Sequence, residues 1–197
     1  MSMRLIIGIS GASGVIYGIR LLEILKNHDD VETHLILTSH GRLNISLETD
    51  YSAKEVEAMA SEVHSDRNLA AKLASGSFKT DAMIVVPCSM KTLSGIVHSY
   101  SDNLLVRAAD VVLKDCRRLL LVPRESPLHV GHTRMIHQAA EMGAVIVPPM
   151  PAFYNRPETL DDIINHTVGR ILDVLGLEAD FVKRWEGVRN KSTHGSD

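Results

Sequence analysis

This chain of 197 residues has few cysteines, few aromatic residues and fewer basic than acidic residues. Its two cysteines are too few for the disulfide framework of a small secreted domain. The formal net charge of −3 gives no basic surplus for general binding to nucleic acid. No apolar run approaches the roughly 20 residues that span a membrane. Without a basic and apolar leader at the start, we expect a protein of the cytoplasm.

Two familiar phosphate-binding motifs are also missing. No Gly-Lys-Ser/Thr follows the glycine-rich turn near the N-terminus, which excludes a P-loop. The glycines at positions 8, 11 and 14 do not follow the G-x-G-x-x-G order of dinucleotide-binding folds. The second predicted strand ends at Ser39, where such a fold carries an acidic residue for the ribose. These absences favour a mononucleotide such as FMN over NAD or a nucleoside triphosphate.

What the N-terminus does contain is a predicted strand over residues 3–9, a glycine turn and an amphipathic stretch. Glycine lets the backbone approach an anion, and the first turn of a helix offers free N–H groups and a positive dipole end. The hydroxyls of Ser10 and Ser13 add donors. The pattern predicts a phosphorylated ligand, and a tight strand-to-helix connection without a ligand is the alternative.

Strand-like and helix-like segments alternate along the rest of the chain. The predicted strands are 3–9, 32–38, 82–87, 118–122 and 144–147, and the predicted helices are 14–27, 53–60, 103–115, 132–142 and 159–174. The runs 82–86 and 119–122 are continuously apolar, which is typical of parallel strands covered on both faces. The sequence therefore predicts an α/β fold with a three-layer, Rossmann-like or flavodoxin-like, doubly wound parallel sheet.

One domain is expected over residues 1–186, because a chain of this size suits a single α/β unit. Residues 187–197 are polar, and we expect them to be a frayed tail. The lone Trp185 lies just before that tail. We expect the segment around it to pack on another surface, such as a neighbouring subunit.

Polar side chains gather in the loops that follow the predicted strands. Ser39 and His40 follow the second strand, residues 89–92 follow the third, and Arg124 and Glu125 follow the fourth. Ligands of a doubly wound sheet bind outside the carboxyl ends of its strands. The sequence therefore predicts a ligand site at this one edge.

Two other chemistries are weaker alternatives. Cys88 precedes a predicted helix, where a thiolate is favoured, but no histidine and acid pair accompanies it as in a nucleophilic enzyme. His129, His132 and His137 lie close in sequence, but no carboxylate or thiolate pattern completes a metal site. Loop hydrogen bonds and packing are the favoured roles of these histidines.

Seven short motifs match one family in order and spacing. They are Gly11-Ala12-Ser13-Gly14, Leu47-Glu48-Thr49-Asp50, Ser75-Gly76-Ser77, Pro87-Cys88-Ser89-Met90-Lys91-Thr92-Leu93, Arg107-Ala108-Ala109-Asp110-Val111, Pro123-Arg124-Glu125 and Pro151-Ala152-Phe153-Tyr154. From residue 3 to Trp185 the chain resembles the UbiX family of flavin prenyltransferases, within the homo-oligomeric flavoproteins that include cysteine decarboxylases. It looks most similar to the small Pad type that is encoded with bacterial phenolic-acid decarboxylases.

The resemblance implies a transferase that needs no metal. Family members join the five-carbon group of dimethylallyl phosphate to N5 and C6 of reduced FMN, and a UbiD-type decarboxylase uses the prenylated FMN. They form dodecamers with each site at a subunit junction. Two departures concern residues 132–136, which differ from the family's His-Leu-Glu-Asn-Met segment, and Leu69, where some members carry a tryptophan.

The resemblance also implies roles for individual residues. Glu125 would act as the acid or base, with Glu48 and Ser13 as a nearby relay. Residues that would bind the flavin are Ala12, Ser13, Gly14, Ser39, Ser89, Met90, Lys91, Thr92 and Arg124. Residues that would bind the phosphate of the donor are Arg107, Lys114, Tyr154 and Arg170. A solvated basic face is the alternative for Arg107 and Lys114, which lie two helical turns apart.

Two other functions stay open at this point. One is direct decarboxylation of an aromatic acid with FMN, and the other is a non-catalytic subunit that carries FMN to a decarboxylase. The cluster of basic residues fits a phosphorylated co-substrate better than a neutral ring. Glu125 separates prenyl transfer from the carrier, because a carrier needs no proton donor.

Overall fold

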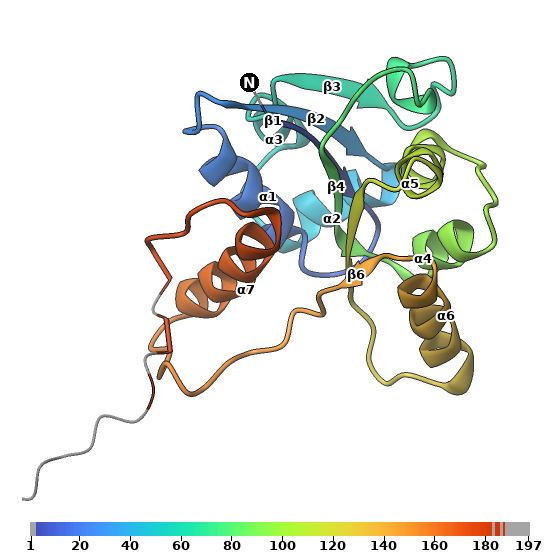
Figure 1. Cartoon of the computed structure of the whole chain (residues 1–197). Helices are drawn as coiled ribbons and strands as arrows, with labels where there is room; N and C mark the ends of the chain where they lie inside the picture. The colour runs from blue at the N-terminus through green and yellow to red at the C-terminus, as the bar shows by residue number, and fades with distance from the viewer. Residues whose placement is uncertain (1–2, 183, 186, 188–197) are drawn as a thin grey trace, which may run out of the picture. The chain divides into compact units, whose positions relative to one another are not determined.

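The computed structural model describes residues 3–182, 184–185 and 187 (Figure 1). The chain divides into two compact units, Met1–Met150 and Pro151–Asp197, and each is described by itself. One domain over residues 1–186 stays a prediction. The predicted frayed tail lies, apart from Gly187, outside the described residues.

The first unit is built on a sheet of six parallel strands in the order β3-β2-β1-β4-β5-β6. The strands are β1 (Met3–Ile9), β2 (Val31–Leu37), β3 (Glu62–Ser65), β4 (Ala82–Cys88), β5 (Arg118–Pro123) and β6 (Val145–Ile146). The direction of winding reverses between β1 and β4. A crevice at such a reversal is where doubly wound sheets bind ligands. The predicted α/β fold is confirmed.

Helices cover both faces of this sheet (Figure 1). On one face α1 (Val15–Leu25) packs on β1, β2 and β4, and it contacts α2 (Ser39–Glu48), which contacts α3 (Ala53–Glu57). On the other face α5 (Leu104–Lys114) packs on β4, β5 and the short 3-10 helix η1 (Lys72–Ala74). It also contacts α4 (Met90–Val97), which packs against α6 (Val130–Glu141). The arrangement is a three-layer α/β structure.

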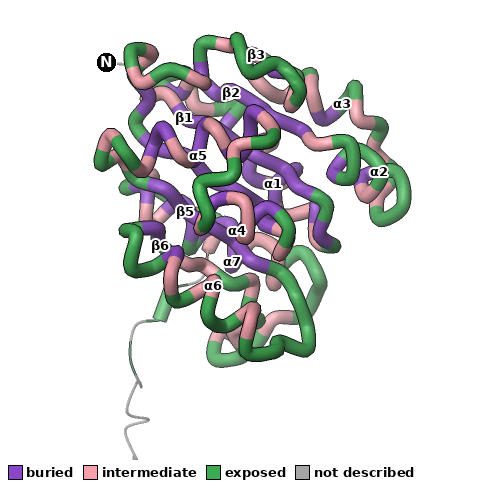
Figure 2. The backbone as a smooth tube through the Cα atoms, turned by 90° about the vertical axis from the view of Figure 1, so that its right-hand side faces the viewer, coloured by how far each residue is buried: buried purple, intermediate pink, exposed green. Residues whose placement is uncertain are grey.

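Apolar strands between two helical layers form the core, drawn purple along β1, β2 and β5 in Figure 2. Every residue of β4 is buried. On the α5 face, Met83 and Val85 of β4 lie in one cluster with Leu105 of α5. Truncating such a side chain to alanine typically costs about 2–5 kcal/mol. The carboxyl ends of the strands are therefore held in fixed positions.

Glycine is required where the first helix approaches the sheet. A Cβ atom on Gly18 of α1 would lie 2.5 Å from the carbonyl oxygen of Val86, which no side chain tolerates. Gly14, before α1, has a φ of 97°, in the left-handed region that favours glycine. These two positions explain why the turn and the helix behind it carry glycine.

In the second unit, α7 (Leu160–Leu175) begins after Thr159, which is its cap residue. The Thr159 hydroxyl accepts a hydrogen bond from the Asp162 amide, and the Asp162 carboxylate accepts one from the Thr159 amide, which completes a capping box. Gly176, with a φ of 78°, ends the helix. In the described part of the chain, every helix is too short or too polar to cross a membrane.

Candidate functional site

The carboxyl edge of the sheet carries a cavity of about 650 Å³, within the range of small-molecule sites. Residues that follow β1, β2, β3, β4 and β5 all line it. The lining residues are Gly11, Thr38, Ser39, His40, Asp66, Ser89, Met90, Lys91, Thr92, Ser94, Gly95, Tyr100, Asp102, Asn103, Val106 and Glu125. The predicted convergence of polar loops at one edge is confirmed.

A buried serine fixes the two loops at the reversal of winding. The hydroxyl of Ser10, after β1, donates to the carbonyl oxygen of Pro87 at 2.8 Å. The Ser10 hydroxyl oxygen also accepts a hydrogen bond from the amide of Ser89 at 2.8 Å. Ser10 is 1% exposed, so both bonds are shielded from water. The start of α4 is thereby held beside the glycine turn.

The N-terminal cap residues of α2 and α4 both line the cavity. Ser89 caps α4 by accepting from the Thr92 amide at 3.2 Å. Thr38 caps α2 by accepting from the Gly41 amide at 3.1 Å. The positive end of each helix dipole stabilises an anion there. The adjoining Ser39 and Lys91 add a hydroxyl and a cation to the lining.

The N-terminus of α1 already binds an anion of the protein itself. The carboxylate of Glu48, the last residue of α2, accepts hydrogen bonds from the amides of Gly14 at 2.7 Å and Val15 at 3.3 Å. The sequence predicted that these amides would face a phosphate. Ser13 is exposed and Ala12 is buried. Gly11 is the residue of the glycine turn that lines the cavity.

Glu125 lines the cavity from the loop after β5. Its Oε1 accepts a hydrogen bond from the amide of Ser126 at 3.0 Å. A partly buried carboxyl was expected at this strand end, whereas Glu125 is exposed in the single chain. Arg124 is also exposed, and its amide donates to the carbonyl oxygen of Cys88 at 3.2 Å. That bond joins the loops after β4 and β5.

The two cations predicted on α5 lie outside the cavity lining. Arg107 donates from Nη1 to Asp110 at 2.7 Å and from Nε to the carbonyl oxygen of Ala74 at 3.2 Å. Lys114 pairs with Asp115 at 2.8 Å. Each cation therefore has an acidic neighbour in the single chain. Their role toward a phosphate stays a prediction.

The other two predicted phosphate ligands belong to the second unit. The hydroxyl of Tyr154 is hydrogen-bonded to Nε2 of His166 at 2.9 Å, and Arg170 pairs with Asp173 at 2.8 Å. Burial, and then the nearby Arg170, lower the pKa of His166. Within this unit the Tyr154 ring also lies 5.6 Å from that of Trp185.

The structure argues against a reactive thiol at Cys88 and gives His129 a local role. Cys88 is fully buried, which raises the pKa of its thiol to about 12, so the thiolate is negligible at neutral pH. Nδ1 of His129 accepts a hydrogen bond from the Gly131 amide at 3.0 Å and caps α6. The ring of His129 lies 3.6 Å from that of His132.

Several lining residues were missed from the sequence. Asp66 follows β3, an unpredicted strand, and Tyr100, Asp102 and Asn103 belong to the loop between α4 and α5. The sequence did contain a signal for Asn103, because it is the first residue of the predicted helix 103–115 and asparagine is a favoured cap residue. Its side chain accepts from the Val106 amide at 3.0 Å. The Asp66 carbonyl oxygen accepts from the Leu104 amide at 2.7 Å, which joins the two loops.

Comparison with known proteins places this geometry among flavoproteins. The family model described as Flavoprotein matches residues 1–172. The flavin prenyltransferase UbiX of Escherichia coli is 59% identical over 186 residues, which cover 93% of this chain and 98% of that protein.

Two crystal structures share the fold along nearly the whole chain. A dodecameric FMN-dependent UbiX-like decarboxylase from Escherichia coli O157:H7 has a TM-score of 0.93 and 52% identity, covering 94% of this chain and 100% of that one. AnUbiX (PadA1), in complex with FMN and dimethylallyl pyrophosphate, has a TM-score of 0.94 and 43% identity, covering 96% of this chain and 100% of that one.

Proposed function

We propose that the cavity where the sheet reverses its winding, between β1 and β4, is the site of prenyl transfer. The premise is that this chain belongs to the UbiX-type flavin prenyltransferases of the Flavoprotein family. The chain is a flavin prenyltransferase that acts on FMN. In detail, reduced FMN receives a dimethylallyl group at N5 and C6 from dimethylallyl phosphate. The convergence of five strand ends in one cavity is the observation that carries this assignment.

The residues present fit a flavin mononucleotide. Hydroxyls of Ser39, Ser89 and Thr92 stand at two capped helix N-termini, which suits the phosphate and the ribityl chain. Met90 and Val106 contribute apolar surface for a planar ring. Lys91 adds positive charge, and Arg124 follows in the next loop. We assign Ala12, Ser13 and Gly14 to the flavin edge nearest the glycine turn.

The protein assists departure of phosphate from the allylic carbon. The C–O bond of dimethylallyl phosphate breaks, a C–N bond to N5 forms, and the N5 proton leaves. A proton then adds to the C=C bond of the transferred group, the resulting tertiary carbon forms a C–C bond to C6, and the C6 proton leaves. Glu125 gives a proton to the departing phosphate oxygen and later accepts one, which is general acid and base catalysis. Glu48, fixed on the Gly14 amide, and Ser13 relay protons beside it.

Fixed cations hold the departing phosphate and stabilise its charge. We assign this role to the cations Arg107, Lys114 and Arg170, together with the neutral hydroxyl of Tyr154 as a hydrogen-bond donor. The acidic partners of the three cations, Asp110, Asp115 and Asp173, then act as counterions until the phosphate takes their place. Loss of one such cation is expected to raise the KM for the donor more than it weakens flavin binding.

Direct decarboxylation is a second candidate, because one similar structure is described as an FMN-dependent UbiX-like decarboxylase. Release of carbon dioxide from a phenolic acid by the purified chain with FMN alone would favour it. The prenyltransferase assignment predicts no release until a partner decarboxylase is added.

The assignment is tested by anaerobic incubation with reduced FMN and dimethylallyl phosphate, followed by mass spectrometry of the extracted flavin. The expected flavin gains one five-carbon unit. Glu125→Gln is expected to bind FMN but to form the product at least about 100-fold more slowly, the usual size of an acid–base contribution. A Glu125→Gln variant that supports a partner decarboxylase as well as the unmodified chain contradicts the catalytic role.

Two partners complete the proposal. The first is further copies of the chain in a dodecamer, as in the similar Escherichia coli structure. In this chain, the exposure of large apolar side chains supports an assembly. Leu47 is 72% exposed and Val130 is 71% exposed, and neighbouring copies would cover them. The second is a UbiD-type decarboxylase that receives prenylated FMN. Light scattering tests the first, and transfer of the modified flavin to the decarboxylase tests the second.

A further inference from the structure

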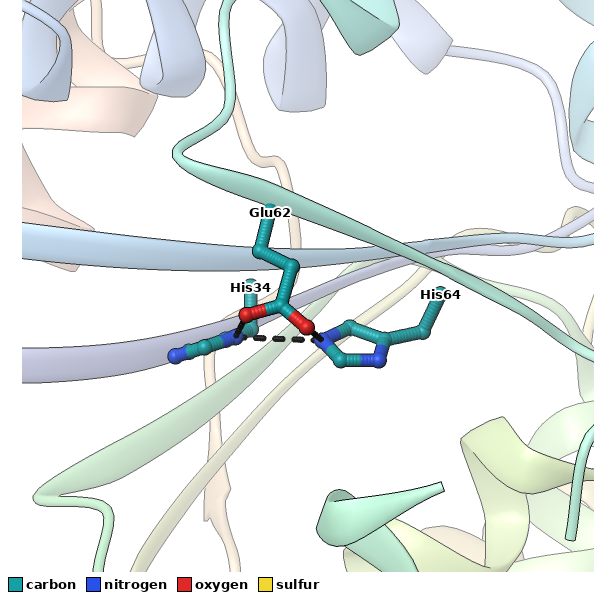
Figure 3. A group of neighbouring side chains, drawn as sticks. All are labelled: His34, Glu62 and His64. Carbon is teal, nitrogen blue, oxygen red and sulfur yellow. Dashed lines mark hydrogen bonds and ion pairs between the residues drawn. The ribbon is translucent and has the colours of Figure 1, made fainter. Parts of the chain in front are cut away.

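Away from the cavity lining, three potential metal ligands meet on the edge of the sheet. They are His34 of β2 and Glu62 and His64 of β3, here called the His–Glu cluster (Figure 3). Glu62 pairs with His34 and His64 pairs with Ile36 in the parallel register, so all three side chains leave the same face of the sheet. We propose that the His–Glu cluster binds a divalent transition metal ion, with Zn²⁺ as the best match.

The spacing of the ligand atoms suits a tetrahedral ion. Nδ1 of His34 lies 3.1 Å from Nε2 of His64, and the Glu62 carboxylate oxygens lie 3.7 Å from the first nitrogen and 3.6 Å from the second. Neighbouring ligands of a zinc ion with bonds of about 2.0–2.1 Å are roughly 3.3 Å apart. An ion therefore fits after shifts of a few tenths of an ångström. Two imidazoles and one carboxylate leave a fourth position for water.

A second carboxylate supports the orientation of His34. Its Nε2 lies 3.0 Å from Oε1 of Glu32, although this buried nitrogen forms no hydrogen bond in the single chain. Arg4 holds Glu32 through a 2.8 Å hydrogen bond. Histidine ligands commonly direct their other ring nitrogen at a carboxylate, which leaves the ligating nitrogen free of its proton. Here a proton on Nε2 leaves the Nδ1 lone pair facing Glu62 and His64.

Burial favours the neutral imidazoles that a metal requires. His34 is 0% exposed and His64 is 7% exposed, and a buried environment disfavours the charged form of an imidazole. Glu62 is partly exposed and opens the cluster to solvent. Lys72 forms an ion pair with Glu62 and holds the pKa of that carboxyl down. Lys72 is therefore a built-in competitor that an ion must displace.

Binding of a metal ion would also restrain the ends of β2 and β3, which lie beside the cavity. The cluster joins edge strand β3 to β2, and the residues just after these strands, Asp66 and Thr38, line the cavity. Fixing β3 therefore fixes one wall of the cavity without a metal contact to any ligand there. The inference does not depend on the proposed function, since binding is measured without flavin.

Zinc binding to the metal-stripped full chain is measured by calorimetry, and cobalt is used as a visible-absorbing substitute. We expect one tight zinc ion per chain, cobalt bands of a four-coordinate site, and a rise in the thermal midpoint with zinc. Glu62→Gln and His64→Gln are each expected to weaken binding at least about tenfold, whereas Lys72→Met is expected to tighten it. Glu62→Gln is the decisive variant, because its side chain is partly exposed and glutamine has nearly the same shape, so the fold is retained.

His137→Gln is the matched control. His137 and Glu141 form an exposed histidine–carboxylate pair at 3.4 Å on α6, so a chain that binds zinc through surface histidines loses affinity in this variant. The proposal expects it to bind like the unmodified chain. Absence of zinc binding, or binding that Glu62→Gln leaves unchanged in a folded protein, overturns the proposal.

Discussion

The hydroxyl oxygen of Ser10 accepts a 2.8 Å hydrogen bond from the backbone amide of Ser89, 79 residues further along the chain. The bond joins the end of β1 to the start of α4, on the two sides of the point where the sheet reverses its winding. Both loops contribute to the cavity, through Gly11 and through Ser89. The geometry of the cavity therefore depends on a buried polar contact as well as on apolar packing.

Ser10→Ala is expected to lower the free energy of unfolding by about 1–3 kcal/mol, because it leaves the part-buried amide of Ser89 without this acceptor. FMN affinity should fall as well, because the start of α4 loses its anchor. Chemical denaturation and flavin titration measure the two effects. Ser46→Ala, at an exposed position on α2, should change stability by less than about 0.5 kcal/mol. Equal effects of the two substitutions would refute the anchoring role.

Glu48→Ala removes the carboxylate that caps α1 and is expected to cost about 1 kcal/mol of stability. Glu48→Gln retains an oxygen for the Gly14 amide and should recover most of that loss. If Glu48 also relays protons, the glutamine variant keeps the KM for FMN and loses kcat. Normal kcat in Glu48→Gln would restrict Glu48 to its capping role.

The two cysteines should differ sharply toward a thiol reagent. Cys88 is buried and the pKa of its thiol is raised to about 12, whereas Cys116 is exposed. The native chain is expected to react with one equivalent and the unfolded chain with two. Cys116→Ser should abolish the native reaction. Rapid modification of Cys88 in that variant would contradict its burial.

The stability of the second unit is expected to depend on pH through His166. Burial lowers the pKa of His166 below its ordinary value near 6.5. Between the lowered pKa and about 6.5, the unfolded chain binds more protons than the folded chain, so stability is full above this window and falls as the pH decreases through it. NMR titration, with His166→Gln identifying the resonance, measures the pKa. A value at or above 6.5 would contradict this environment.

The central strands were predictable because burial on both faces leaves a continuous apolar run, as at residues 82–86. β3 was not predicted. Three of its four residues Glu62–Ser65 are polar, and His64 is the one buried residue among them, so no apolar run marks this strand. Because β3 was not predicted, the lining residue Asp66 and the contact between His34 and His64 were not predicted either.

Residues of the cavity lining were predictable where they directly follow strands, as for Ser39, Ser89 and Glu125. Long-range pairings were not predictable from local pattern. The contact between Glu48 and Gly14 spans 34 residues, and the relay role of Glu48 came only from family resemblance. The partner of Arg107 was within reach, because Asp110 lies one helical turn further on.

Crystals of the full chain soaked with FMN test the central claim most directly. Electron density for the phosphate at the N-termini of α2 and α4, with the ring against Met90 and Glu125 nearby, is the predicted result. Flavin bound elsewhere, with this cavity filled by water alone, would contradict the account.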